Sequence, residues 1–370
     1  MVSRDIIVVG AGVIGCAVAY ELARRGASVE LVDERPAGFG ATQASAGILA
    51  PYLEAHEASP LLALMSRSLE LYDEFVSAVS GDSGDGFDYQ RTGTIDVAVD
   101  TAELSRLQHT ADLAAACGIH AELLDPAAAR RQEPHLTDDV IGALVVPAHG
   151  FVAAADFTRA LAKAAVRRGA RIADPCRVRR ISTVKSHVAV DTDRGAHRAQ
   201  TVIVAAGCWS GGIEIEGSSS TVPVRPVRGQ LLHLAWNGPP LRRVTWAGRC
   251  YLVPWSDGTL LVGATVEEAG FDERATVAGV RDLLEAACDL IPRAWTATFQ
   301  TVRVGLRPGT PDGLPVIGSS RRDERVVYAT GHYRNGVLLA PLTARLIADA
   351  LLDERTDPLI EAVSPARFGL

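Results

Sequence analysis

The sequence predicts an α/β fold with two domains, one built on a parallel sheet and a second, of α+β type, built on a mostly antiparallel sheet. Two observations predict this fold class. The first 34 residues follow the order strand, glycine-rich turn, helix, strand, which is typical of a parallel βαβ unit. Beyond about residue 223, short strand-like runs are separated by turns instead of helices, which indicates antiparallel pairing.

Length and composition limit the possible classes of protein. At 370 residues the chain can bury the cores of two domains. Its net charge of −7 argues against a nucleic-acid partner, which favours a basic surface. The six cysteines form no Cys-x-x-Cys pair, so we expect no metal site. The apolar run Ile6–Val9 is too short for a signal peptide, and no run reaches the roughly 18 residues of a membrane span. We therefore expect a cytoplasmic protein without a membrane partner.

The glycine-rich turn is the most specific signal in the chain. The strand Asp5–Val9 runs into GAGVIG, which places Gly10, Gly12 and Gly15 at G-x-G-x-x-G spacing before a helix and the strand Ser28–Val32. In such a turn the first glycine permits the bend, the second lets a pyrophosphate approach the backbone, and the third lets the helix pack on the strand. The free N–H groups at the helix N-terminus attract phosphates. These residues predict a Rossmann-type dinucleotide site.

Features downstream favour FAD as the dinucleotide, although the turn alone fits NAD equally well. Asp33, followed by Glu34, lies 18 residues beyond Gly15, where an acid can hold the ribose hydroxyls of either dinucleotide. The segment Gly38–Pro51 is rich in small residues that would let backbone approach a large flat ligand; the alternative is a flexible loop. The strand-like run Thr201–Ala205 leads to Gly207 at its carboxyl end, where ligands bind in open α/β sheets. Its alternative is an ordinary core strand.

The remaining elements indicate a discontinuous first domain. We expect a helix over Asp156–Arg168 with Asp156 as its cap, and another over Thr276–Ile291. The expected strands of the second domain are Thr92–Val99, Gln230–Leu234, Tyr251–Val253 and Thr259–Val262. The chain then returns to the first domain through a strand at Val326–Thr330 and a helix that ends near Leu352. We assign 1–88, 141–222 and 307–370 to the FAD-binding domain, and 89–140 and 223–306 to the substrate domain.

These segments resemble the D-amino-acid oxidase superfamily of flavoproteins, and within it the glycine oxidases linked to thiamine biosynthesis. The resemblance covers nearly the whole chain. Its markers are GAGVIG, ATQASAGILAP, VAAGCWS, PVRGQ, CYLVP, LLVGAT, GLRPGTPDGLPVIG and GHYRNGVLLAP. They are more specific for the superfamily than for the substrate.

The resemblance implies which residues hold FAD. Val13 and Ile14 would lie in the phosphate loop, Asp33 and Glu34 at the ribose, and the backbone of Val178 at the adenine. Two segments would surround the flavin. The first is Ala41, Thr42, Ala46, Gly47 and Ile48, and the second is His332, Tyr333, Arg334, Asn335, Gly336, Val337 and Leu338. Related enzymes that bind flavin covalently use a cysteine near Val304–Arg307, and none lies there, so we expect non-covalent FAD.

The resemblance also implies a substrate site. Arg307 would bind the substrate carboxylate, Tyr251 would assist it, and Arg334 would border the pocket. The chemistry agrees, because a guanidinium presents two parallel donors to a carboxylate and a phenol donates one more bond. The alternatives are a structural ion pair for Arg307, strand packing for Tyr251 and a surface or cap role for Arg334. Val266 and Arg249 depart from a glycine-oxidase relative that has Met and His there, which leaves the substrate open.

Together these inferences predict an FAD-dependent oxidase of glycine or of small D- or N-methyl-amino acids. Its products would be a 2-oxo acid, ammonia or an amine, and hydrogen peroxide formed from dioxygen. We also expect a homo-oligomer. One alternative is a dehydrogenase of the same fold that passes electrons to a quinone or a carrier protein. Another is a non-catalytic FAD-binding subunit of a larger complex.

Overall fold

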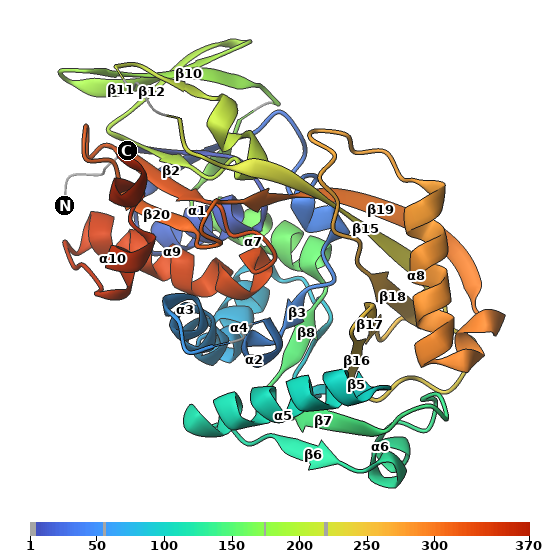
Figure 1. The fold of residues 1–370 in the computed structure, drawn as a ribbon. Helices are drawn as coiled ribbons and strands as arrows, with labels where there is room; N and C mark the ends of the chain where they lie inside the picture. Colours follow the sequence, from blue (N-terminus) through green and yellow to red (C-terminus); the bar gives the residue numbers. More distant parts are fainter. Residues whose placement is uncertain (1–4, 55–56, 174, 218–220) are drawn as a thin grey trace.

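The computed structural model describes residues 5–54, 57–173, 175–217 and 221–370, and the first part of the fold is a six-stranded sheet (Figure 1). The strand order is β20-β21-β13-β1-β2-β9, and all neighbours run parallel except the edge strand β20. The strands are β1 (Asp5–Val9), β2 (Ser28–Val32), β9 (Arg171–Ile172), β13 (Thr201–Val204), β20 (Val316–Ser319) and β21 (Val326–Thr330). The predicted parallel sheet is confirmed.

Apolar side chains on both faces explain why this sheet is central. In β1, Ile6 and Val8 face one core while Ile7 and Val9 face another, because successive side chains of a strand point to opposite sides. Helices cover the first face: α1 (Val13–Arg24), α3 (Pro60–Glu70), α4 (Tyr72–Ser83), α7 (Ala154–Arg167), α9 (Gly336–Leu352) and α10 (Leu359–Val363). A four-stranded sheet covers the second face: β12-β11-β10-β14, with β10 (Val178–Val184), β11 (His187–Thr192), β12 (Gly195–Ala199) and β14 (Glu214–Ile215).

The second part is an eight-stranded sheet in the order β19-β15-β18-β17-β16-β5-β7-β6, antiparallel except where β16 pairs with β5. Its strands are β5 (Thr94–Ala98), β6 (Glu122–Leu124), β7 (Gly142–Val146), β15 (Arg225–Ala235), β16 (Val244–Ala247), β17 (Cys250–Pro254), β18 (Thr259–Gly263) and β19 (Thr298–Gly309). Helix α8 (Val277–Leu290) packs on one face, where Leu283 and Ala287 join Leu232 and Leu252 in one core. Two more helices flank this sheet: α5 (Thr101–Ala116) and α6 (Pro126–Gln132).

A small sheet, β3-β8-β4, lies between the two larger ones (Figure 1). Its strands are β3 (Ile48–Leu49), β8 (Gly150–Val152) and β4 (Tyr89–Gln90), and helix α2 (Pro51–Glu54) follows β3. The remaining short helices are 3-10 turns at Ala41–Ala44, Gly207–Gly212, Pro292–Thr296 and Pro365–Phe368.

One predicted helix start is wrong. Asp156 does not cap α7, because the helix begins at Ala154 and its N-cap is Ala153, which makes no side-chain hydrogen bond. Asp156 instead lies in the first turn, where it pairs with Arg159. By contrast, the helix predicted from Thr276 is confirmed, with the Thr276 side chain accepting a bond from the N–H of Gly279.

The division into domains stays a prediction, and the sheets indicate how its boundaries would move. Strand β7 (Gly142–Val146), assigned above to the FAD-binding domain, pairs with β5 and β6 in the eight-stranded sheet. Strand β19 continues past the assigned boundary at 306/307 as far as Gly309. Within the described ranges, no helix is long and apolar enough to cross a membrane.

Candidate active site

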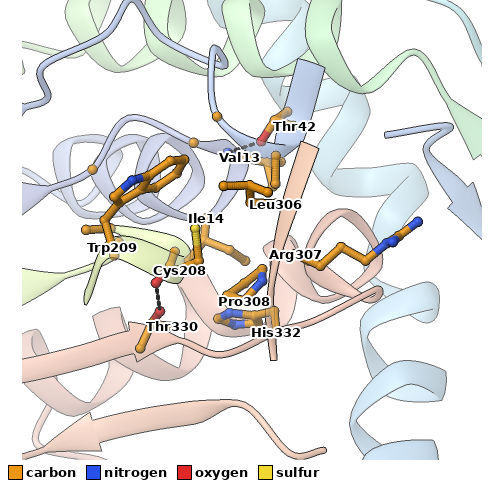
Figure 2. A pocket seen from close by; sticks show the side chains of 18 of the residues that line it. Val13, Ile14, Thr42, Cys208, Trp209, Leu306, Arg307, Pro308, Thr330 and His332 are labelled. Carbon is orange, nitrogen blue, oxygen red and sulfur yellow. Dashed lines mark hydrogen bonds between the residues drawn. The ribbon is translucent and has the colours of Figure 1, made fainter. Parts of the chain in front are cut away.

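A cavity of about 520 Å³ lies at the carboxyl ends of β1, β2, β13 and β21, and the edge of the eight-stranded sheet forms its far wall. Figure 2 shows part of its lining, with Trp209 and Cys208 on one side and the Arg307 side chain directed away from them. Every residue predicted for the cofactor lines this cavity except Gly15 and Leu338, and Arg307, Tyr251 and Arg334 line it too. The structure thus brings the predicted residues to one place, while their roles stay predictions.

The glycine-rich turn is held by backbone contacts that only glycine permits. Gly10 has a φ of +107°, and a Cβ there would lie 2.4 Å from the carbonyl oxygen of Ala205. A Cβ on Gly15 would lie 1.8 Å from the carbonyl oxygen of Gly10, so this glycine lets α1 pack against the turn. A Cβ on Gly12 would meet only the Thr42 hydroxyl, at an ordinary 3.6 Å, which leaves this stretch of backbone open to the cavity.

The segment Gly40–Ile48 forms the wall beside this turn. The Thr42 hydroxyl accepts a 3.1 Å hydrogen bond from the N–H of Val13, which fixes the segment against the start of α1 (Figure 2). Gly47 has a φ of +70°, and a Cβ there would lie 1.7 Å from the carbonyl oxygen of Val152. Gly47 is therefore required by the contact with β8, and it also lines the cavity, so its part in ligand approach stays a prediction.

Asp33 and Glu34 take different positions at the end of β2. The Asp33 carboxylate accepts hydrogen bonds from the N–H groups of Ala11, at 2.6 Å, and Arg35, at 2.8 Å. Burial raises the pKa of Asp33, although both N–H bonds oppose the shift. Glu34 is more exposed and pairs with Arg177 at 3.2 Å. Asp33 thus orients the glycine turn, and both carboxylates retain lone pairs for ribose hydroxyls.

The segment His332–Val337 brings a helix N-terminus to the cavity, because α9 begins at Gly336. His332 is buried, its Nε2 atom lies 3.1 Å from the hydroxyl of Thr343, and burial lowers its pKa to about 3. The imidazole is therefore neutral. Tyr333 adopts a φ of +48°, and its N–H donates to the carbonyl of Pro308, which ties this segment to β19.

Arg307, on β19, is half-buried in the cavity wall. Its Nη1 atom donates to the carbonyl oxygens of Thr265, at 3.0 Å, and Arg228, at 3.3 Å. Among the described residues, no carboxylate lies within 4.0 Å of its guanidinium, so the alternative of a structural ion pair is not supported. With Nη1 occupied by two carbonyls, Nε and Nη2 remain as an edge with two parallel donors, the arrangement that a carboxylate prefers.

Tyr251 approaches the same region from β17. Its ring lies 5.1 Å from that of Trp246, which also lines the cavity. Burial raises the pKa of Tyr251 above its ordinary value, although the positive charges of Arg307 and Arg334 oppose the shift. The phenol stays protonated and can donate a hydrogen bond. Arg334 forms an ion pair with Glu54 at 3.2 Å, so its charge is already compensated.

Sequence reasoning missed several aromatic residues of the lining. Trp209, Trp246 and Phe271 all line the cavity, and the guanidinium of Arg35 lies 4.6 Å from the centre of the Trp209 ring. Arg35 also pairs with Glu273 at 2.9 Å, which links the end of β2 to the segment before α8. Trp209 lies within the marker VAAGCWS and could have been found from it, whereas the others carry no signal of spacing.

The two departures from the glycine-oxidase pattern lie outside this lining. Arg249 pairs with Asp289 at 2.8 Å, and both side chains are exposed. Val266 is 56% exposed and does not line the cavity. The two substitutions therefore leave the cavity wall described here unchanged.

The chemistry of the cavity fits FAD. One end offers an open glycine turn, the N-terminus of α1 and two carboxylates, which suit a pyrophosphate and a ribose. The middle is lined by small residues and neutral groups, which suit a flat ring system, and the other end holds Arg307 and Tyr251.

A parallel sheet with this glycine turn, joined to a second sheet across one cavity, is typical of dinucleotide-binding oxidoreductases. The family model described as DAO, FAD dependent oxidoreductase, matches residues 5–350, and the chain belongs to this family. Its cofactor is therefore FAD.

Three comparisons describe what the chain is similar to. A glycine oxidase of Geobacillus kaustophilus is 33% identical in sequence, over 95% of this chain and 94% of the relative. The crystal structure of glycine oxidase from that species superposes with a TM-score of 0.92, over 99% of this chain and 98% of the other. The bifunctional protein ThiO/ThiG of Nostoc sp. is 34% identical over 97% of this chain, which spans only 54% of that relative. An iminodiacetate oxidase from Chelativorans sp. is 26% identical, with a TM-score of 0.86 over 97% and 98% of the two chains.

Proposed function

We propose that this chain catalyses the oxidative deamination of glycine or a small D- or N-methyl-amino acid, giving a 2-oxo acid, ammonia or an amine, and hydrogen peroxide. The names of its relatives, glycine oxidase and iminodiacetate oxidase, support a small amino acid as substrate. One observation carries the proposal: Arg307 presents a charged guanidinium edge to the cavity without a carboxylate partner in the described part of the chain.

Arg307 would bind the substrate carboxylate through Nε and Nη2. Charge-assisted, bidentate bonds of this kind are about twice as strong as neutral ones and fix the plane of the carboxylate. The protonated hydroxyl of Tyr251 would donate to the same carboxylate. Two anchors on one carboxylate orient the α-carbon, whose hydrogen would then face the flavin.

Bound FAD supplies the acceptor for the hydride that leaves the α-carbon of the substrate. The protein contributes by positioning the substrate, and the carboxylate of Glu54 in the same lining is paired with Arg334. His332 is neutral because of its depressed pKa, so it adds no positive charge that would repel the developing cation at the α-carbon. Water then hydrolyses the resulting imine to the 2-oxo acid and ammonia or amine.

The test is an anaerobic titration of the purified holoenzyme with a panel of amino acids, which follows the loss of flavin absorbance. Bleaching by glycine, sarcosine or a small D-amino acid supports the proposal and identifies the substrate. A flavin that no amino acid reduces would favour a non-catalytic FAD-binding subunit. Oxygen uptake and peroxide assays on the same preparation separate an oxidase from a dehydrogenase, because only an oxidase reoxidises rapidly in air.

The proposal extends to the cellular setting. We propose a role beside thiamine biosynthesis, on the strength of the similarity to ThiO/ThiG proteins and glycine oxidases. A cytoplasmic location and a homo-oligomeric state also stay predictions. Fractionation of cells and measurement of the molecular mass in solution test them.

A further inference from the structure

Two glycines lie beneath the two side chains to which carboxylate binding is assigned. A Cβ on Gly229, in β15, would lie 2.3 Å from Nη1 of Arg307 and 2.4 Å from its Cζ and Nη2 atoms. Gly263, in β18, is the cross-strand partner of Tyr251, and a Cβ there would lie 2.5 Å from ring atoms and the hydroxyl oxygen of Tyr251. We call these two residues the glycine floor.

The backbone does not require glycine at position 229. Gly229 has no φ in the left-handed region and lies in a regular antiparallel pair opposite Gly305, whereas Gly263 ends β18 opposite Leu231 and precedes a cis peptide bond to Ala264. Glycine inside a strand weakens the strand, because it has no side chain to pack and loses more entropy on folding. The reason for Gly229 therefore lies in the Arg307 guanidinium that packs on it, and the Tyr251 phenol packs on Gly263 in the same way.

We propose that Gly229 and Gly263 are positioning residues that set the preference of the site for carboxylates, an inference that rests on the function proposed above. With no Cβ in the way, the Arg307 guanidinium lies against the backbone of β15, and its Nη1 atom donates to the carbonyls of Arg228 and Thr265. A methyl group at position 229 would displace it by about 1 Å, the difference between 2.3 Å and ordinary contact. Because the guanidinium ends a flexible side chain, it can move by this distance without disturbing the fold. The bidentate bond to the substrate carboxylate would lose its geometry.

Arg307 donates to the carbonyl oxygens of Arg228 and Thr265, and a polar network holds these two residues in place if the guanidinium moves. Arg228 pairs with Glu267 at 2.5 Å and with Asp272 at 3.2 Å. Glu267 also accepts hydrogen bonds from Thr265, at 2.5 Å, and from Gln230, at 2.7 Å. The carbonyls of Arg228 and Thr265 are thus fixed to β15, and a displaced guanidinium loses its alignment with them and with the substrate.

The experiment measures acetate binding to the holoenzyme, followed by the change in visible absorption of the bound flavin. We expect Gly229→Ala to raise the dissociation constant of acetate at least tenfold, since a misplacement of about 1 Å can cost up to about a hundredfold in function. FAD content and thermal midpoint should match those of Gly86→Ala, a control at an exposed glycine whose Cβ would meet nothing within 4 Å.

A double variant tests whether the effect passes through Arg307. Gly229→Ala should add nothing to Arg307→Ala, and an additive weakening of acetate binding overturns the inference. If Arg307→Ala binds acetate poorly but Gly229→Ala binds it with wild-type affinity, the inference about Gly229 is overturned. The proposed function then remains intact. Wild-type affinity in Arg307→Ala would instead contradict the proposed function. If Gly229→Ala fails to retain FAD, Gly263→Ala provides the same test through Tyr251, and unchanged acetate binding there overturns the inference.

Discussion

The end of the cavity beside β1 is built mainly from backbone, whereas the end beside β15 and β19 is built from side chains. At the first end, the open glycine turn and the N-terminus of α1 offer N–H groups, and Asp33 acts largely by holding that turn. At the second end, Arg307 and Tyr251 reach in from different strands of one antiparallel sheet.

The contrast teaches which changes each end tolerates. Backbone donors depend on local conformation, so the cofactor end depends on where glycines permit close contacts, as Gly10 and Gly15 do. Side-chain donors depend on what lies beneath them and beside them, so the substrate end depends on partners distant in sequence, such as Gly229 and Thr265. Substitutions at one end should therefore leave the function of the other largely unchanged.

The largest expected effect tests the substrate end alone. Arg307→Ala should lower kcat/KM for a carboxylate substrate by roughly thirty- to several-thousand-fold, because loss of one partner of a buried charge pair costs about 2–5 kcal/mol. Arg307→Lys, which keeps the charge and loses the fork, should also be impaired. FAD content should stay at the wild-type level. Equal losses for amines with and without a carboxylate, in steady-state assays, would make Arg307 structural and break the comparison.

A smaller effect is expected at the cofactor end. Asp33→Ala removes the acceptor for the N–H groups of Ala11 and Arg35. Loss of one hydrogen bond to a charged group costs about 1.5–3 kcal/mol, or roughly ten- to a hundredfold in FAD affinity. Reconstitution of the apoprotein with FAD measures this loss of affinity. The loss is smaller if Glu34 binds the ribose hydroxyls in place of Asp33. An Asp33 and Glu34 double variant with wild-type FAD affinity would refute a role for this acid pair.

Acid should destabilise the folded chain through its buried imidazoles. Burial lowers the pKa values of His332 and His149 to about 3, against an ordinary value of 6.5. Between these values the unfolded chain binds more protons than the folded one, so the free energy of unfolding falls as pH drops from about 6.5 towards 3. Each group contributes a slope of at most about 1.4 kcal/mol per pH unit.

Thermal midpoints measured across this pH range provide the test. The slope should be flatter in His332→Asn than in wild type, even if the variant is less stable at pH 7. Equal slopes in wild type and His332→Asn would show that His332 does not titrate as described.

The smallest effect concerns the attachment of the flavin, for which we expect no covalent bond. No cysteine lies within Val304–Arg307, and burial raises the pKa of Cys208, in the cavity wall, to about 12, so its thiol is a poor nucleophile. Acid or heat denaturation should release all the yellow colour into the supernatant. Colour retained in the precipitate would mean that a side chain contributes a covalent bond.

The same contrast explains what the sequence could predict. The glycine turn and Asp33 lie in short contiguous segments with a recognisable spacing, whereas the segment before α9 was predicted only through the family resemblance. Trp246 and Phe271 enter the cavity through strand pairing and a loop, which no local pattern encodes. The cap predicted at Asp156 failed because an acid three residues before an arginine also suits the first turn of a helix, where Asp156 pairs with Arg159. The role of Gly229 depends on the register of β15 against β19 and emerges only from the fold.

The order of strands in the six-stranded sheet has a consequence for the synthesis of the chain. Strand β1 pairs on one side with β2, which follows closely, and on the other with β13, which pairs in turn with β21 at Val326–Thr330. The cavity wall likewise extends from Val9 to Val337. Nine-tenths of the chain must leave the ribosome before the wall can close, so FAD can be captured only after translation is nearly complete. Until then β13 lacks its neighbour β21 on one side, and the folding yield should depend on how quickly the last part of the chain arrives.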